Sequence, residues 1–226
     1  MSRIDQEYLK KLDDLINADF DDYDSEDDFT TEDYLEGNVK IEDIRDVYQE
    51  LLYLVIDKSV SMHYNGLEDA VRQSLADVKR TVNGSEEESR IQTAMTFFGS
   101  TLDMRPFQYG ECIDISYSAT ENKTRLYDAV VESCKNMISQ YDKLKYTTKL
   151  NGVMLIFTDG DENGSGEYDL NEVQFYLNEL EERDIKYCVA AFKGVNVEQL
   201  SKDFKTETII IEDKHRLRRF IRRFMH

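Results

Sequence analysis

The chain of 226 residues has no tryptophan, one proline (Pro106) and three cysteines. So little proline favours regular secondary structure, and a hydrophobic fraction of 40% is enough for a sizeable core. The odd number and wide spacing of Cys112, Cys134 and Cys188 argue against a disulfide framework or a paired-cysteine metal site. Each cysteine stands among apolar residues, so we expect buried free thiols.

Basic residues and long apolar runs are also scarce. The chain has 28 Lys and Arg against 47 Asp and Glu, a net charge of −19. Nucleic-acid binding relies on Lys and Arg, and anionic lipid repels an acidic protein, so we expect neither nucleic acid nor membrane as a partner. No apolar run approaches the roughly 20 residues of a membrane span. Residues 1–7 carry two acids, Asp5 and Glu7, where a signal peptide needs an apolar stretch, and the predicted location is the cytoplasm.

The first 46 residues differ from the rest. Between Asp13 and Asp46 there are fifteen acids and two bases, Lys40 and Arg45. A short amphipathic helix is predicted just before this run, and the run itself is too charged to bury a core. We therefore expect two parts, an acidic and partly flexible N-terminal extension at 1–46 and a domain at 47–226.

Within the second part, apolar runs of strand length alternate with apolar residues at helical spacing. Strands are predicted at 51–56, 91–98, 153–157, 185–192 and 208–211, and helices at 67–82, 126–138, 170–180, 197–203 and 217–224. Segments 102–107 and 112–115 are weaker candidates for edge strands or a hairpin around Gly110. This alternation predicts an α/β fold, a doubly wound, mostly parallel sheet flanked by helices. Binding groups in such sheets gather at the carboxyl ends of the strands.

Oxygen-bearing side chains cluster in the sequence at those ends. Asp57, Ser59 and Ser61 follow the first apolar strand, Asp159 follows the central one, and Thr124 precedes a helix between them. Two carboxylates and three hydroxyls would make a site for a hard cation. Mg²⁺ takes about six oxygens and keeps several waters, so an incomplete protein shell favours Mg²⁺ or Mn²⁺ over Ca²⁺.

This arrangement resembles the von Willebrand factor type A (VWA) domain and its metal-ion-dependent adhesion site. The family pattern is Asp-x-Ser-x-Ser on the first loop, Thr on the second and Asp on the third, and the five residues match it in order. The stretch Thr-Arg-Leu-Tyr-Asp-Ala from Thr124 is also similar to the family's helix start. The resemblance covers about residues 48–226 and implies a Rossmann-like fold. It further implies that Ser59, Ser61 and Thr124 ligate directly, and that Asp57 and Asp159 act directly or through water.

These loops allow two other interpretations. Asp, Ser and Thr also cap helices, so the residues could be ordinary turn residues, with Thr124 placed to cap the next helix. Lys123 departs from the family pattern, and an ammonium near the cation would weaken binding. An EF-hand beginning at Asp159 is excluded, because a strand precedes it and Leu170 stands where the loop needs Glu. Asp161 and Asn163 are then expected at the rim of the site.

The resemblance implies a non-enzymatic module that binds a partner's carboxylate through the metal, as a subunit of an intracellular assembly of bacterial type. Two alternatives stay open: a metal-dependent hydrolase or phosphatase, and a structural subunit whose metal only stabilises the loops. No base accompanies the two serines in the sequence, which disfavours nucleophilic catalysis. The predicted last helix carries five arginines, which either favour its dipole or contact the acidic extension intramolecularly: Arg216, Arg218, Arg219, Arg222 and Arg223.

Overall fold

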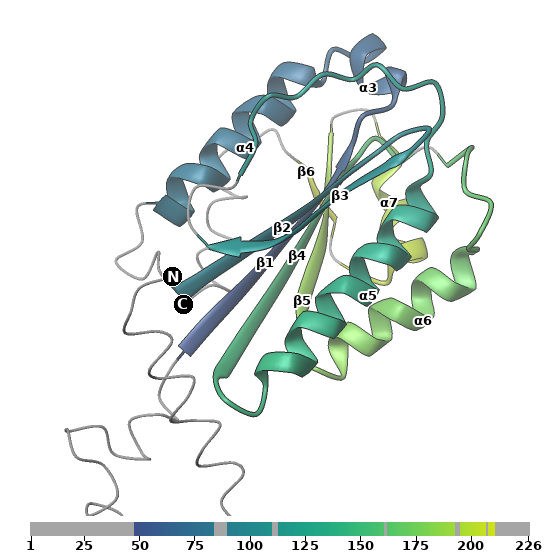
Figure 1. Ribbon diagram of the computed structural model, residues 1–226. Helices are drawn as coiled ribbons and strands as arrows, with labels where there is room; N and C mark the ends of the chain where they lie inside the picture. The colour runs from purple at the N-terminus through teal and green to yellow at the C-terminus, as the bar shows by residue number, and fades with distance from the viewer. Residues whose placement is uncertain are drawn as a thin grey trace, which may run out of the picture. The chain divides into compact units, whose positions relative to one another are not determined.

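The computed structural model describes residues 48–83, 90–109, 113–160, 162–192, 195–206 and 208–210. These residues form six strands and five helices: β1 (Tyr48–Asp57), α3 (Val60–Tyr64), α4 (Glu68–Asn83), β2 (Ile91–Phe98), β3 (Leu102–Tyr109), α5 (Leu126–Leu144), β4 (Lys149–Thr158), α6 (Leu170–Glu181), β5 (Lys186–Ala191), α7 (Val197–Phe204) and β6 (Thr208–Ile210). Helices α3 and α4 lie on one face of the sheet, and α5, α6 and α7 lie on the other (Figure 1).

The sheet has the strand order β3-β2-β1-β4-β5-β6. All neighbouring strands are parallel except β3, which is antiparallel to β2 at one edge. The chain leaves β1 toward β2 on one side and returns to β4 on the other. The point where the winding reverses therefore lies between β1 and β4, and their carboxyl ends are where such sheets bind ligands.

Strand β1 is apolar on both faces because helices cover both. Its alternate side chains enter two cores, with Leu54 packing toward α4 and Val55 toward α5. Residues Leu52 to Ile56 are all 0% exposed, and burying each such side chain contributes about 1.5–3 kcal/mol. This tightly packed strand fixes the position of Asp57 at its end.

The predicted α/β architecture is confirmed, as are its strands and helices within the described residues. Cys134 and Cys188 are buried free thiols, as expected. The short helix α3 was not predicted. None of the described helices is long and apolar enough to cross a membrane.

Of the two alternatives predicted for 102–115, the edge strand is confirmed for 102–107 and the hairpin around Gly110 is wrong. Segment 102–107 belongs to β3, which pairs with β2 across a turn at Gly99, and residues 113–115 are irregular. Position 99 requires glycine, because a Cβ there would lie 2.2 Å from the Cβ of Glu121, too close for any side chain.

Several predictions lie outside the described residues. These are the acidic extension at 1–46, the helix at 217–224 and the intramolecular contact of its arginines with the acidic extension. The burial of Cys112 and the place of Asp161 at the rim of the site also lie outside them. The domain boundary at residue 47 likewise stays a prediction.

Candidate metal centre

Asp57 ends β1 and is fully buried. Its Oδ1 accepts a hydrogen bond from the Ser59 backbone N–H at 2.8 Å, and its Oδ2 accepts one from the Thr158 hydroxyl at 2.9 Å. The Tyr117 hydroxyl donates to the Asp57 backbone carbonyl. The carboxylate is thus held in one orientation at the end of the strand.

The two serines of the first loop face each other. Ser59 occupies the N-cap position of α3, yet its side chain makes no capping hydrogen bond. Instead its Oγ lies 2.9 Å from the Oγ of Ser61. The Ser59 side chain therefore does not cap α3, and the two hydroxyls form an adjacent pair of oxygen donors.

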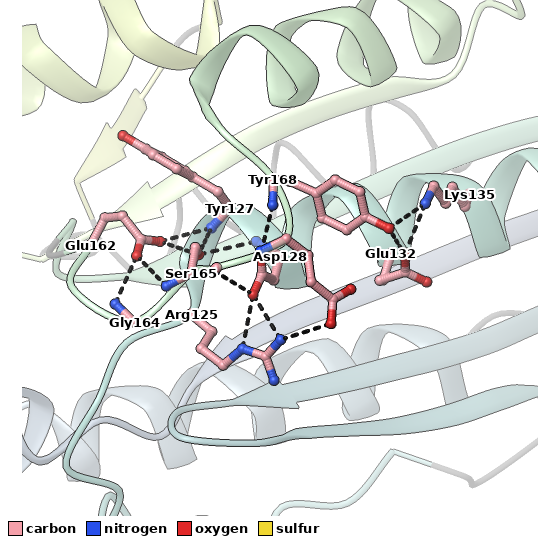
Figure 2. Close-up of polar contacts among 11 residues, drawn as sticks. Arg125, Tyr127, Asp128, Glu132, Lys135, Glu162, Gly164, Ser165 and Tyr168 are labelled. Carbon is pink, nitrogen blue, oxygen red and sulfur yellow. Dashed lines mark hydrogen bonds and ion pairs between the residues drawn. The ribbon is translucent and has the colours of Figure 1, made fainter.

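Thr124 lies on the second loop and is buried. This loop rests on the first one, because Ser59 and Glu121 form a parallel bridge and the Val60 N–H donates to the Glu121 carbonyl at 2.6 Å. The prediction that Thr124 caps α5 is wrong, since the N-cap residue is Arg125. The N–H groups at the start of α5 bond to the third loop instead (Figure 2).

Asp159 lies on the third loop, directly after β4, and is 9% exposed. Its Oδ2 accepts a hydrogen bond from the Asn65 side chain at 3.3 Å. Asp159 also acts electrostatically on Asp57, as expected for carboxylates at the ends of adjacent strands. The structure thus gathers the three loops that carry the five predicted residues at the carboxyl ends of β1 and β4. We call this end of the sheet the site edge.

Burial raises the pKa of Asp57 to about 7, and the nearby charge of Asp159 adds to this effect. Hydrogen bonds from Ser59 and Thr158 oppose the rise without cancelling it. Two carboxylates that repel each other in a buried place are stabilised by a cation. The donors are all hard oxygens, which suits Mg²⁺ or Mn²⁺.

Histidine and cysteine donors do not contribute to this set. Within the described ranges, no three His, Cys, Asp or Glu side chains form a cluster able to hold a metal ion. His63, which adjoins the first loop, is exposed and lies 3.0 Å from the Glu68 carboxylate. Any cation at the site edge would therefore depend on two carboxylates and on neutral hydroxyls.

The metal-free protein is expected to lose stability as the pH rises from about 4 to about 7. Folded Asp57 keeps its proton up to about pH 7, whereas a free aspartate releases it near 3.8, so the folded state binds more protons in this window. The loss is on the order of 4 kcal/mol at most. Urea unfolding in chelator at pH 5 and pH 8 measures it.

The control for this pH dependence is Asp57→Asn, which cannot ionise and should flatten the difference between the two pH values. Asp114, whose pKa is lowered to about 2 chiefly by its Ser116 hydrogen bond, titrates below this window. An equal loss of stability in the wild type and in Asp57→Asn would show that Asp57 is not the group responsible.

Three residues near the site escaped the sequence analysis, and a fourth, Asn163, was expected only at its rim. Thr158 and Tyr117 hold Asp57, Asn65 contacts Asp159, and Asn163 bonds to the Thr124 backbone rather than standing only at the rim. Thr158 could have been found from the sequence, because it is the last residue of β4 and stands directly before Asp159. No local pattern marks Tyr117 or Asn65. Lys123 is exposed.

A comparison with protein-family models finds no match, and a comparison of the sequence with curated proteins finds none either. Solved structures do match in fold. The pilus adhesin SpaC from Lactobacillus rhamnosus GG matches with a TM-score of 0.59 at 10% identity, over 79% of this chain and 30% of SpaC. The chain thus spans less than a third of SpaC.

Two further matches are structures that contain metal ions. Manganese-loaded TRAP protein of Plasmodium vivax matches with a TM-score of 0.57 at 17% identity, over 78% of this chain and 73% of that one. Proximal thread matrix protein 1 of the mussel byssus, with a zinc-occupied MIDAS motif, gives 0.59 at 13% identity, over 80% of this chain and 48% of that one. These likenesses concern the fold, and they show that the chain has the VWA-type α/β fold.

Proposed function

We propose that this chain is a metal-dependent protein-binding module. Asp57, Ser59, Ser61, Thr124 and Asp159 would hold a divalent cation, Mg²⁺ or Mn²⁺, and a carboxylate of a protein partner would complete its coordination. The bound cation would act as a Lewis acid and attract this carboxylate. A cytoplasmic location, as a subunit of a larger assembly, is part of the proposal.

The observation that carries the proposal is the buried pair Asp57 and Asp159 beside the hydroxyls of Ser59 and Ser61. The two carboxylates supply the negative charge, and the hydroxyls add oxygen donors without adding charge. The set therefore favours one further anionic oxygen from outside the chain. Metal-loaded structures with the same fold support the proposal that the site edge takes a divalent ion.

The partner's carboxylate can be tested with a peptide probe. Mn²⁺-loaded protein is titrated with a hexapeptide that is acetylated and C-terminally amidated, so that one central Asp carries its only carboxylate, and water-proton relaxation is recorded. We expect the relaxation enhancement to fall as the carboxylate displaces water from the metal. The same peptide with Asn in place of Asp is the matched control and should change nothing.

Equal responses to the Asp and Asn peptides would contradict the binding mechanism. Metal that raises the melting temperature without any peptide response would favour a structural subunit. Metal-dependent release of p-nitrophenol from its phosphate ester would favour a hydrolase.

Thr124→Ala is expected to weaken capture of the Asp peptide more than it weakens Mn²⁺ binding. The two carboxylates and both serines remain, so most of the attraction for the cation is kept. Calorimetric titrations of Mn²⁺, and then of the peptide, measure the two affinities. If Thr124→Ala lowered the Mn²⁺ affinity and the peptide affinity by the same factor, Thr124 would have no role in peptide capture beyond its role in binding the cation.

A further inference from the structure

Helix α5 begins without a cap of its own. The first N–H groups of a helix have no partner within it, and the N-cap residue Arg125 has a side chain that cannot accept hydrogen bonds. The third loop supplies the acceptors instead. The Tyr127 N–H donates to Glu162 Oε2 at 2.9 Å, and both it and the Asp128 N–H donate to Ser165 Oγ, at 3.1 and 3.2 Å (Figure 2).

The same loop holds the backbone of Thr124 from two sides. The Thr124 N–H donates to Asn163 Oδ1 at 2.9 Å. The Thr124 carbonyl accepts from the N–H groups of Asn163, at 3.2 Å, and of Gly164, at 3.0 Å. A Cβ on Gly164 would lie 3.2 Å from that carbonyl oxygen, so glycine allows the loop to lie directly against the Thr124 peptide.

The loop is itself firmly anchored on α5. The buried Asp128 carboxylate pairs with Arg125 at 2.8 Å and accepts from three loop N–H groups, those of residues 166, 167 and 168, at 3.1–3.2 Å. Burial by itself would raise the pKa of Asp128, but Arg125 and these donors outweigh it and lower the pKa. Glu162 Oε1 also accepts from the N–H groups of Gly164 and Ser165 (Figure 2). The loop therefore acts as a fixed support rather than as a loose connection.

We propose that Asn163 is a positioning residue for the metal centre, holding the Thr124 backbone so that the Thr124 hydroxyl stays in place for the cation. The second and third loops are thereby linked, since Asn163 stands four residues after Asp159. This inference rests on the function proposed above. Asn163 is exposed, so its replacement should disturb this link without opening the core.

The test is a double-mutant cycle on Mn²⁺ affinity, measured by calorimetry on the full chain. Asn163→Ala should weaken Mn²⁺ binding about tenfold, as is typical for residues that orient a metal ligand. Added to Thr124→Ala, it should cause no further loss, because the hydroxyl that it positions is already gone. Equal losses in both backgrounds would overturn the proposal.

Asn163→Asp is the conservative variant, since it keeps an acceptor for the Thr124 N–H. It should restore the affinity that Asn163→Ala loses. Asn163→Asp also adds a negative charge. The effect of this charge on Mn²⁺ affinity is measured in the Thr124→Ala background and subtracted. Failure to restore affinity after this correction would count against the role of the hydrogen bond.

A second readout needs no metal. In metal-free protein, Asn163→Ala should speed amide hydrogen exchange at Thr124, whereas Asn171→Ala, which removes an exposed amide near the start of α6, should not. Unchanged exchange at Thr124 would overturn the inference. Failure of the proposed function would appear differently, as a wild type that does not bind Mn²⁺ at all.

Discussion

Asp159→Ala is expected to abolish measurable Mn²⁺ binding and to leave the metal-free protein at least as stable as the wild type. Asp159 contributes one of only two carboxylates, so little attraction for a cation remains without it. In the absence of metal its charge disfavours ionised Asp57. Removing that repulsion should stabilise the folded state by on the order of 1 kcal/mol at pH 8. Calorimetric titration and urea unfolding measure the two effects.

The matched control is Asp69→Ala on α4. It removes the same charge from a side chain that is 97% exposed, where solvent and salt screen its effect on the centre. Mn²⁺ affinity should then change by less than about twofold. Retained Mn²⁺ binding in Asp159→Ala, or an equal loss in both variants, would contradict a specific role for Asp159.

Asp128→Ala should destabilise the protein by about 3–5 kcal/mol, the usual cost of removing one member of a buried ion pair. The substitution leaves the Arg125 guanidinium and the N–H groups of Gly166, Glu167 and Tyr168 without their shared acceptor. Urea unfolding of the metal-free variant measures the loss. Because the freed loop also carries Asn163, Mn²⁺ affinity should fall as well.

Glu132→Ala is the control for this prediction. Glu132 lies one turn further along α5 and bonds to Lys135 and to the Tyr168 hydroxyl, but its side chain is 32% exposed (Figure 2). Its loss should cost less than about 1 kcal/mol, as for ion pairs near the surface. If the two variants were equally stable, Asp128 would not be the main anchor of the third loop.

The sequence predicted most of the sheet because burial on both faces leaves a plain signal. Strands β1 and β4 contain continuous apolar runs, residues 51–56 and 153–157, and each strand ends in a polar residue just before a loop. The edge strand β3 carries the exposed Met104 and Tyr109 and lacks such a signal. Its pairing with β2 is an antiparallel ladder that a short turn connects, and the turn glycine, Gly99, packs against Glu121, 22 residues further along the chain.

The five candidate ligands could be named from the sequence because each follows or precedes a recognisable element. Their surroundings could not. The alternative interpretation of Thr124 as the cap of α5 followed a local rule, but the acceptors at the start of α5 come from Glu162 and Ser165, more than 30 residues away. The pairing of the Ser59 and Ser61 hydroxyls likewise depends on the backbone of the first loop, which a list of residues does not specify. That the five residues ligate a metal remains a prediction.

The most direct test is a calorimetric titration of Mg²⁺ and of Mn²⁺ into metal-stripped full-length chain, with Asp57→Ala and Asp57→Asn beside the wild type. Urea unfolding of the three proteins confirms that each is folded. We predict saturable binding at one site in the wild type and none in either variant. A wild type without saturable binding, or equal binding in all three proteins, would contradict a metal centre at the site edge and leave only a shared fold.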